Sequence, residues 1–274
     1  MSEAEAVTGV QDPGTAASLT KDLRSLGLLQ GSTVLVHSSL SALGWVAGSA
    51  QAVIEALLTA IGSEGTLAMP SHSAHLTEPS GWENPPVPES WWETIRDEMT
   101  PFEPTKTPTR GMGATCELFR SWPDVRRSFH PTGSFAALGP NADRVVKGHS
   151  LENQFGEGSP LARLYELDAS VLLLGVGHSS NTSLHLAEYR SEWPGKKTIT
   201  SGSPIIEGGV RRWVTYSDVD VDSDDFDALG TDFRQTGMQI EGMVGQGTCL
   251  LMRQRDVVDF AVSWIPRHRG KEHT

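Results

Sequence analysis

The pattern of apolar and polar positions predicts alternating strands and helices. Short apolar runs are typical of buried strands, and they occur at 33–36, 66–69, 136–138, 171–177, 210–216 and 248–252. Amphipathic spacing or helix-start residues predict helices at 19–29, 48–61, 111–120, 160–167, 182–190 and 256–264. The first strand, helix and strand imply a right-handed crossover and a parallel pair. We therefore expect one α/β domain with a central mixed sheet flanked by helices.

This pattern breaks down between Ser71 and Pro108. The stretch has six prolines between Pro79 and Pro104, and three tryptophans, with one short helix expected at 90–99. Loops this long inside a compact domain are usually functional, so it is either a wall for a sugar-like ligand or an ordinary packed loop. We expect a domain at 18–266 with an irregular substrate-side insertion at about 71–108, a disordered tail at 1–17 and a second tail at 267–274.

Composition narrows the classes of function. The chain has 274 residues, with 22 Lys plus Arg, 34 Asp plus Glu and a net charge of −12. An acidic chain is a poor partner for nucleic acid. The charge permits a preference for cationic substrates, although it is equally a source of solubility. Hydrophobic residues make up 38%, which indicates a globular fold, and the lack of a long apolar run predicts no membrane span.

The cysteines and the N-terminus bear on the compartment. Cys116 and Cys249 are too few for a zinc site built on cysteine pairs, and two reduced thiols are the simplest expectation. Residues Met1 to Ala17 include acids and have no apolar core, which is unlike a secretory signal. We therefore expect a cytoplasmic protein.

The segment from Val36 to Gly44 (VHSSLSALG) is the first candidate binding loop. It follows a predicted parallel strand, at the end where α/β proteins bind ligands. Its small residues would let a ligand approach the backbone, whose N–H groups can bind phosphate or carbonyl oxygen. It has neither the Walker nor the G-x-G-x-x-G spacing, so an ordinary strand-to-helix turn is the alternative.

A second candidate binding loop is the segment from Thr107 to Gly113 (TPTRGMG). Arg110 precedes a predicted helix start, where it could meet a phosphate. The alternative is a surface turn.

The segment from Gly175 to Glu188 carries the strongest candidate chemistry. A buried strand leads through a glycine-bearing turn to a helix that Ser180 or Asn181 could cap. His185 and Glu188 are three residues apart, so they share a helix face, and histidine is well suited to take a proton near neutral pH. Two alternatives are a structural histidine and a metal site built from His178, His185 and Glu188, although this spacing differs from H-x-x-x-H.

Acidic residues follow a strand at Trp213 to Asp222. Asp218, Asp220 and Asp222 alternate, so on an extended backbone they would face one side. One carboxylate could orient the imidazole of His185 and another could hold a substrate ammonium. The alternatives are a solvated acidic loop or a calcium loop, although the EF-hand spacing is absent.

Together these motifs resemble the aminoglycoside 3-N-acetyltransferase family, antibiotic acetyltransferases of the non-GNAT type. The resemblance extends from about Leu23 to Val262, and its order and spacing are specific. The segments that carry it are VHSSLSALG (36–44), GTLAMPSHS (65–73), TPTRGMG (107–113), RRSFHPTGSFAALG (126–139), SPLARLYELD (159–168), LLLGVGHSSNTSLHLAE (172–188) and WVT with Asp218 and Asp220.

The resemblance implies an activity and a set of site residues. It implies acetyl-CoA as co-substrate without a metal, acetylation of the 3-amino group of a 2-deoxystreptamine ring, and antibiotic resistance. It points to His185 as the base, assisted by Asp218 or Asp220. It places along the cofactor Ser38, Ser39, Leu40, Ser41, Leu43, Gly44, Ser71, Ser73, Arg110, Met112 and Gly113. It places beside the substrate His72, Asn181, Glu188, Asp218 and Asp220.

These expectations define a reaction hypothesis. A substrate ammonium must lose a proton before its nitrogen can attack a thioester, and His185 would take that proton. Backbone N–H groups of the Ser38–Ser39 turn would stabilise the oxyanion. The partner is then a polycationic amino sugar, for a monomer or homodimer that binds neither nucleic acid nor membrane. The rivals are transfer to a different amine, an acyl-enzyme through Cys116, a metal-dependent hydrolase and a non-catalytic binding protein.

Overall fold

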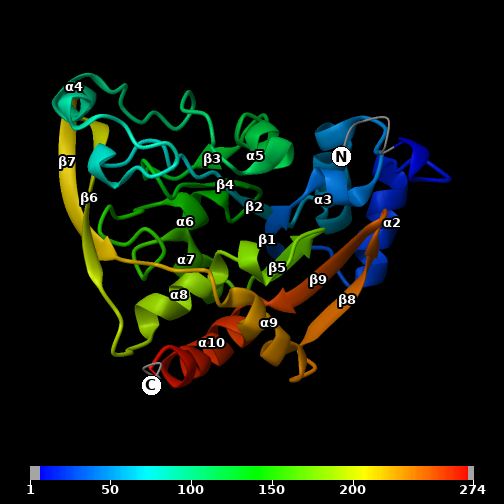
Figure 1. Ribbon diagram of the computed structural model, residues 1–274. Coiled ribbons are helices and arrows are strands. Elements are labelled where there is room, and N and C mark those ends of the chain that lie inside the picture. The colour runs from blue at the N-terminus through cyan, green and yellow to red at the C-terminus, as the bar shows by residue number, and fades with distance from the viewer. Residues whose placement is uncertain (1–6, 271–274) are drawn as a thin grey trace.

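A seven-stranded mixed sheet forms the centre of the protein (Figure 1). The computed structural model describes residues 7–270. The strand order is β3-β4-β2-β1-β5-β9-β8. The strands are β1 Thr33–Ser38, β2 Thr66–Pro70, β3 Arg126–Arg127, β4 Phe135–Leu138, β5 Ser170–Leu174, β8 Gln239–Val244 and β9 Gly247–Arg253. β1 runs parallel to both β2 and β5, and the outer strands pair antiparallel. The mixed α/β sheet expected from the sequence is confirmed.

Helices cover both faces of this sheet (Figure 1). Alternate side chains of β1 point to opposite layers: Val34 and Val36 pack in one core, and Leu35 packs in the other. The first layer contains α2 Ala16–Leu26, α3 Ser49–Ile61 and α5 Gly113–Arg120. The second contains α6 Ala142–Val146, α7 Pro160–Glu166, α8 Ser183–Arg190, α9 Phe226–Arg234 and α10 Gln254–Arg269. Two-sided burial is the reason that the central strands are uniformly apolar.

A separate antiparallel hairpin, β6 Thr198–Glu207 and β7 Val210–Val219, extends along one side of the domain (Figure 1). The irregular insertion contacts it: the backbone N–H of Phe102 donates to the carbonyl of Pro204. The insertion contains only short elements, namely η2 Pro79–Gly81, η3 Glu89–Trp91 and α4 Trp92–Glu98.

The domain reaches further towards both termini than the sequence suggested. Gly14 forms a parallel bridge with Val46 and α2 begins at Ala16, so residues 14–17 are not a disordered tail. α10 continues to Arg269, past the expected tail boundary at 267. Of the two expected tails, residues 1–6 and 271–274 lie outside the described residues. Within 7–270, every helix is too short or too polar to cross a membrane.

Candidate active site

The functional side chains gather where the parallel strands end. Ser38, the last residue of β1, pairs in register with Leu174, the last residue of β5. The chain leaves β5 through Gly175, which has a φ of +71°, and a side chain there would lie 2.7 Å from that of Ala42. Glycine at this position thus lets the loop after β1 pack against the loop after β5. Both loops, with the segment after β2, surround two adjoining cavities.

The first cavity has a volume of about 740 Å³ and runs along the loop after β1. It is lined by seven of the residues that the resemblance placed along the cofactor: Ser38, Ser39, Leu40, Ser41, Gly44, Met112 and Gly113. The turn before α5 supplies its opposite side. The cavity is open and built largely from small residues, so a long, narrow ligand can contact the backbone along it.

The second cavity, of about 420 Å³, shares Ser38, Gly111, Met112, Val176 and Ser180 with the first. Its deeper wall carries His37, His72 and His185, from three different parts of the chain. His37 is the penultimate residue of β1, His72 follows β2 and His185 lies on α8. The three imidazoles therefore stand beside a space that is continuous with the first cavity.

His185 is held firmly on three sides. Its Nδ1 lies 2.5 Å from Glu188 Oε2, one helical turn away. The ring of Phe155 stacks on the imidazole with 5.0 Å between centroids and an interplanar angle of 17°. Phe226 packs at 4.9 Å between centroids. The imidazole side chain is 14% exposed, and its edge forms part of the cavity wall. With Nδ1–H donated to the carboxylate, Nε2 is the nitrogen that can accept a proton.

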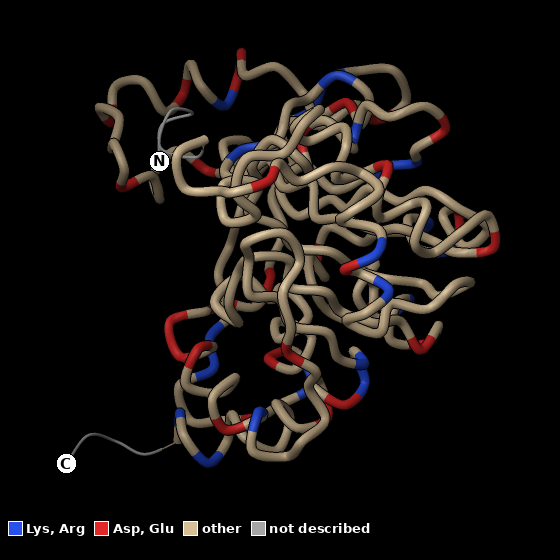
Figure 2. The backbone as a smooth tube through the Cα atoms, turned by 90° about the vertical axis from the view of Figure 1, so that its right-hand side faces the viewer, with Lys and Arg blue, Asp and Glu red and all other residues tan. Residues whose placement is uncertain are grey.

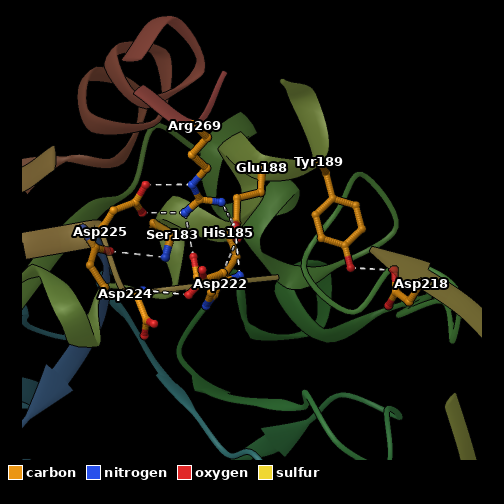
Figure 3. Close-up of polar contacts among 10 residues, drawn as sticks. Ser183, His185, Glu188, Tyr189, Asp218, Asp222, Asp224, Asp225 and Arg269 are labelled. Carbon is orange, nitrogen blue, oxygen red and sulfur yellow. Dashed lines mark hydrogen bonds and ion pairs between the residues drawn. The ribbon is translucent and has the colours of Figure 1, made fainter. Parts of the chain in front are cut away.

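Glu188 is completely buried, and both of its oxygens are bonded (Figure 3). Oε2 contacts His185, while Oε1 accepts from the backbone N–H of Asp222 at 2.9 Å and from the guanidinium of Arg269. A buried carboxylate is stable in its ionised form only when it is paired and hydrogen-bonded. Glu188 meets both conditions. It therefore does not contact substrate, contrary to our expectation.

The carboxylate expected beside His185 bonds elsewhere. Asp218 accepts from the hydroxyl of Tyr189 at 2.6 Å (Figure 3). It also accepts from the backbone N–H groups of Gln154 and Val219, at 2.9 Å each. Burial raises the pKa of Asp218 above its usual value. Asp220 is exposed, and its backbone N–H donates to the carbonyl of Lys197. The expected pairing of His185 with Asp218 or Asp220 is therefore wrong: Glu188, on the same helix, occupies that position.

Two histidines of the second cavity are neutral: His37 is buried, and His72 is partly buried with an inaccessible Nε2. Burial, followed by the nearby His185, lowers the pKa of His37 to about 3. Burial, followed by the other histidines, lowers the pKa of His72 to about 3. Within the part of the chain that the structure describes, no hydrogen-bond partner meets Nε2 of either ring or the hydroxyl of Ser38. Buried polar atoms of this kind are exceptional, and three of them along one cavity suit a polar ligand.

Four residues expected along the cofactor lie elsewhere. Leu43 is in the hydrophobic core, and Ser71 is fully buried. The Ser73 hydroxyl, also buried, donates to the carbonyl of Pro108. Arg110 lines a different cavity, of about 370 Å³, within the irregular insertion. The glycine- and serine-rich motifs lie in loops that line the first cavity, but which side chains are exposed there depends on packing.

Two further details depart from the reaction hypothesis. Asn181 is fully buried, and its Oδ1 accepts from the backbone N–H of Ser183, so it caps the start of α8 rather than facing substrate. The backbone N–H of Ser39 donates to the carbonyl of Leu174 at 2.9 Å and is not free to bind an oxyanion. The Ser38 hydroxyl is the better-placed donor.

The rival chemistries gain no support from the geometry. Burial raises the pKa of Cys116, which borders the second cavity, to about 12, so its nucleophilic thiolate is scarce at neutral pH. His178 points its Nε2 at the side chain of Gln239, 2.7 Å away. Across residues 7–270, no group of three or more histidine, cysteine or acidic residues is placed to hold a metal ion.

A carboxylate-held imidazole in a cavity wall can serve as a general base, and the adjoining cavity leaves room for a second substrate. A family model described as aminoglycoside 3-N-acetyltransferase matches residues 35–266, and the chain belongs to this family of acyltransferases. It is 46% identical to the SPbeta prophage-derived aminoglycoside N(3')-acetyltransferase-like protein YokD of Bacillus subtilis (strain 168), over 94% of this chain and 95% of that protein.

Solved structures agree with this assignment. The crystal structure of YokD matches with a TM-score of 0.95 and 44% identity, covering 98% of this chain and 99% of YokD. A structure named AAC-IIIb binary with CoASH matches with a TM-score of 0.85 and 29% identity, covering 96% of this chain and all of the other. A structure of AAC-VIa bound to sisomicin matches with the same TM-score and identity, covering 95% of this chain and all of the other.

Sequence reasoning missed three side chains that shape the site. His37 is part of the recognised loop, yet only its burial next to the cavity shows that its ring faces inward. Phe155 lies in a segment without a local pattern. Arg269 lies 81 residues from Glu188, and no spacing rule connects them. The pair of His185 and Glu188 had a readable signal, the three-residue spacing on one helix.

Proposed function

We propose that this protein transfers the acetyl group of acetyl-CoA to an amine of an aminoglycoside, at the 3-amino group of a 2-deoxystreptamine ring, with His185 as general base. The observation that carries the proposal is the His185–Glu188 pair, whose imidazole lines the second cavity, which adjoins the first at Ser38. The relatives named for CoASH and sisomicin support the same two ligand classes. The cytoplasm, where acetyl-CoA and reduced thiols coexist, is the fitting compartment.

The first cavity suits the donor. The pantetheine arm of CoA is long and narrow and carries amide groups, and the cavity is open and lined by small residues and serine hydroxyls. The thioester would then lie near Ser38, which borders both cavities. The Ser38 hydroxyl could donate to the carbonyl oxygen as negative charge develops on it. The neutral rings of His37 and His72 offer further polar atoms at this point.

The second cavity suits the acceptor amine. Nε2 of His185 takes the proton that the amine loses, the amine nitrogen bonds to the acetyl carbon, and the bond from that carbon to sulfur breaks. The departing thiolate takes up the proton that Nε2 accepted and leaves as the free thiol of CoA. Glu188 keeps the proton of the resting imidazole on Nδ1 and stabilises the imidazolium that forms. The raised pKa of Cys116 favours this direct transfer over an acyl-enzyme.

Remaining ammonium groups of the acceptor need acidic partners outside the second cavity, which has no carboxylate in its lining. The segment between β7 and α9 carries Asp220, Asp222 and Asp224, all exposed, and Figure 3 shows the last two on the same side as His185. Elsewhere, acids and bases are interspersed over the backbone in the view of Figure 2, so the net charge alone does not locate a site.

The deciding experiment measures release of the CoA thiol from acetyl-CoA with apramycin-, gentamicin- and kanamycin-type aminoglycosides. His185→Ala should lower kcat by about 10²–10⁴-fold, the usual contribution of a general base, while acetyl-CoA binding survives. His178→Gln, which alters a histidine of the same segment that bonds Gln239, is the matched control. Near-normal turnover in His185→Ala would refute the base, and no thiol release with any aminoglycoside would refute the acceptor class.

A further inference from the structure

We infer that Arg269, the last residue of α10, is a positioning residue for acetyl transfer. It holds Glu188 ionised and oriented so that this carboxylate accepts the Nδ1–H of His185. The inference rests on the proposed role of His185. It concerns a residue beyond 266, where the match to the family model ends.

The carboxylate of Glu188 is gripped from two sides (Figure 3). Oε2 faces His185, whereas Oε1 takes hydrogen bonds from Arg269 and from the backbone of Asp222. Rotation of the carboxylate would break contacts at both oxygens. Arg269 therefore fixes which oxygen faces the imidazole, and a displacement of about 1 Å at such a group can cost about 10²-fold in rate.

Arg269 is itself held in place, so it can fix the position of the Glu188 carboxylate. Its guanidinium makes two bonds to the carboxylate of Asp225, at 2.7 and 2.5 Å, and one to the carbonyl of Asp222 at 2.7 Å. The rings of Trp193 and Phe226 lie over it. Burial opposes the charge, but the bonds to Asp225 and Glu188 outweigh it and raise the pKa of Arg269. The cation is thus permanent and fixed.

Charge balance explains why the enzyme needs this contact. The fully buried Glu188 forms an ion pair with Arg269 and with no other Arg or Lys among residues 7–270. A buried carboxylate that loses its cation is expected to bind a proton instead. A protonated Glu188 would donate to Nδ1 of His185, which would place the ring proton on Nε2. An imidazole in that tautomer cannot accept the proton of the amine.

The test compares Arg269→Gln with Arg269→Lys and with Arg267→Gln, a control at an exposed position of the same helix. Arg269→Gln should lower kcat by about 100-fold while the KM for acetyl-CoA changes by less than about twofold, because the donor cavity is untouched. Arg269→Lys, which restores the charge without the fork, should recover part of kcat. Arg267→Gln should resemble the parent enzyme.

A spectroscopic readout separates positioning from a loss of folding. Ring ¹⁵N shifts of His185 should show the proton on Nδ1 in the parent enzyme and on Nε2 in Arg269→Gln. An unchanged tautomer, or a kcat within about threefold of the parent, would overturn the inference. This measurement needs no turnover, so it decides the role of Arg269 even if His185→Ala refutes the proposed base.

A double-mutant cycle covers the case in which Arg269→Gln folds poorly. The double variant Glu188→Gln, Arg269→Gln removes both buried charges. If Arg269 acts through Glu188, the double variant should match the kcat of Glu188→Gln alone, because the effects of coupled residues do not add. A further loss of about tenfold would show that Arg269 acts by another route.

Discussion

Glu188 and Asp218 are two buried carboxylates at α8: Glu188 belongs to the helix, and Asp218 is bonded to the next helix residue, Tyr189. The two carboxylates differ in the charge of their partners. Glu188 is bonded to the imidazole of His185 and to the cation of Arg269. Asp218 is bonded to the hydroxyl of Tyr189 and to two backbone N–H groups, all of them neutral. A nearby cation favours an ionised carboxylate, whereas burial among neutral donors disfavours it. The raised pKa of Asp218 agrees with this difference.

The two carboxylates therefore have different roles in the molecule. In the proposed reaction Glu188 supports the chemistry, because its carboxylate accepts the Nδ1–H of His185. Asp218 supports the shape of the second cavity, because it connects β7 and α8 to the backbone of Gln154, whose neighbour Phe155 stacks on His185. The resemblance pointed to Asp218 or Asp220 as the partner of His185, and the structure instead makes Asp218 an anchor for the cavity wall.

Replacing each carboxylate by its amide is the strongest test of this contrast. Glu188→Gln should lower kcat by about 10²–10⁴-fold, because the imidazole loses both its tautomer control and its counter-charge. Asp218→Asn keeps acceptor oxygen for Tyr189 and should lower kcat by less than about tenfold. The measurement is the initial rate of thiol release at saturating acetyl-CoA. A larger loss in Asp218→Asn than in Glu188→Gln would invert our assignment.

The contrast extends to the histidines. His185 is bonded to the carboxylate of Glu188. Burial, in contrast, lowers the pKa of His37 and His72 to about 3 and that of His130 to about 4. Unfolded histidines titrate near 6.5, so between about pH 6.5 and 4 the unfolded chain binds more protons than the folded one. The free energy of unfolding should therefore fall as the pH falls through this window, by up to about 1.4 kcal/mol per pH unit for each histidine.

Urea denaturation across this pH window checks the prediction. His72→Asn should flatten the pH dependence, because it removes one of the buried groups that must charge on unfolding. His268→Gln, at an exposed histidine, is the control and should leave the slope unchanged. A denaturation midpoint that stays constant between about pH 6.5 and 5 would contradict the neutral, buried state of these rings.

Much of the fold could be predicted because its signals are local. The apolar runs at 33–36 and 171–177 became β1 and β5, and Ser159 caps α7 as its sequence predicted. β6 (TITSGSPIIE) and β8 (QIEGMV) were not predicted. β6 mixes Gly, Pro and Ser in a hairpin outside the main sheet, and β8 is an edge strand with several exposed positions. Such strands lack the apolar alternation on which prediction depends.

The site shows the same limit. The loop at 38–44 and His185 could be predicted, since both follow a buried strand at the edge where ligands bind. The partner of His185 was misassigned, because the sequence offers both Glu188 and Asp218 as candidate acids. Only the packing of α10 distinguishes these two buried carboxylates. Arg269 was placed in a tail, and no local pattern shows that it reaches Glu188 from the end of the chain.

Removing the phenol that holds Asp218 tests the anchoring role directly. Tyr189→Phe deletes a 2.6 Å hydrogen bond to Asp218 and leaves a buried carboxylate with one donor fewer. Unfolding free energy should fall by about 1–3 kcal/mol, as for other buried groups that lose a partner. The kcat should fall only modestly, since His185 and Glu188 are untouched. A stability equal to the parent, measured by urea denaturation, would show that the phenol contributes nothing to the anchor.

The exposed acids supply the smallest expected effect and the last contrast, between buried carboxylates in the site and exposed ones that we propose to meet the substrate. If Asp220 and Asp224 attract ammonium groups of the acceptor, Asp224→Asn should raise the KM for the aminoglycoside by about two- to fivefold, as expected for an exposed ion pair. The KM for acetyl-CoA should not change. Added salt should reduce the difference between variant and parent, because exposed charges are screened.

Glu64→Gln, next to the start of β2 and therefore at the opposite edge of the sheet, is the control. An equal rise in both KM values would mean that the acidic loop supports the fold of the site and does not recognise the cation.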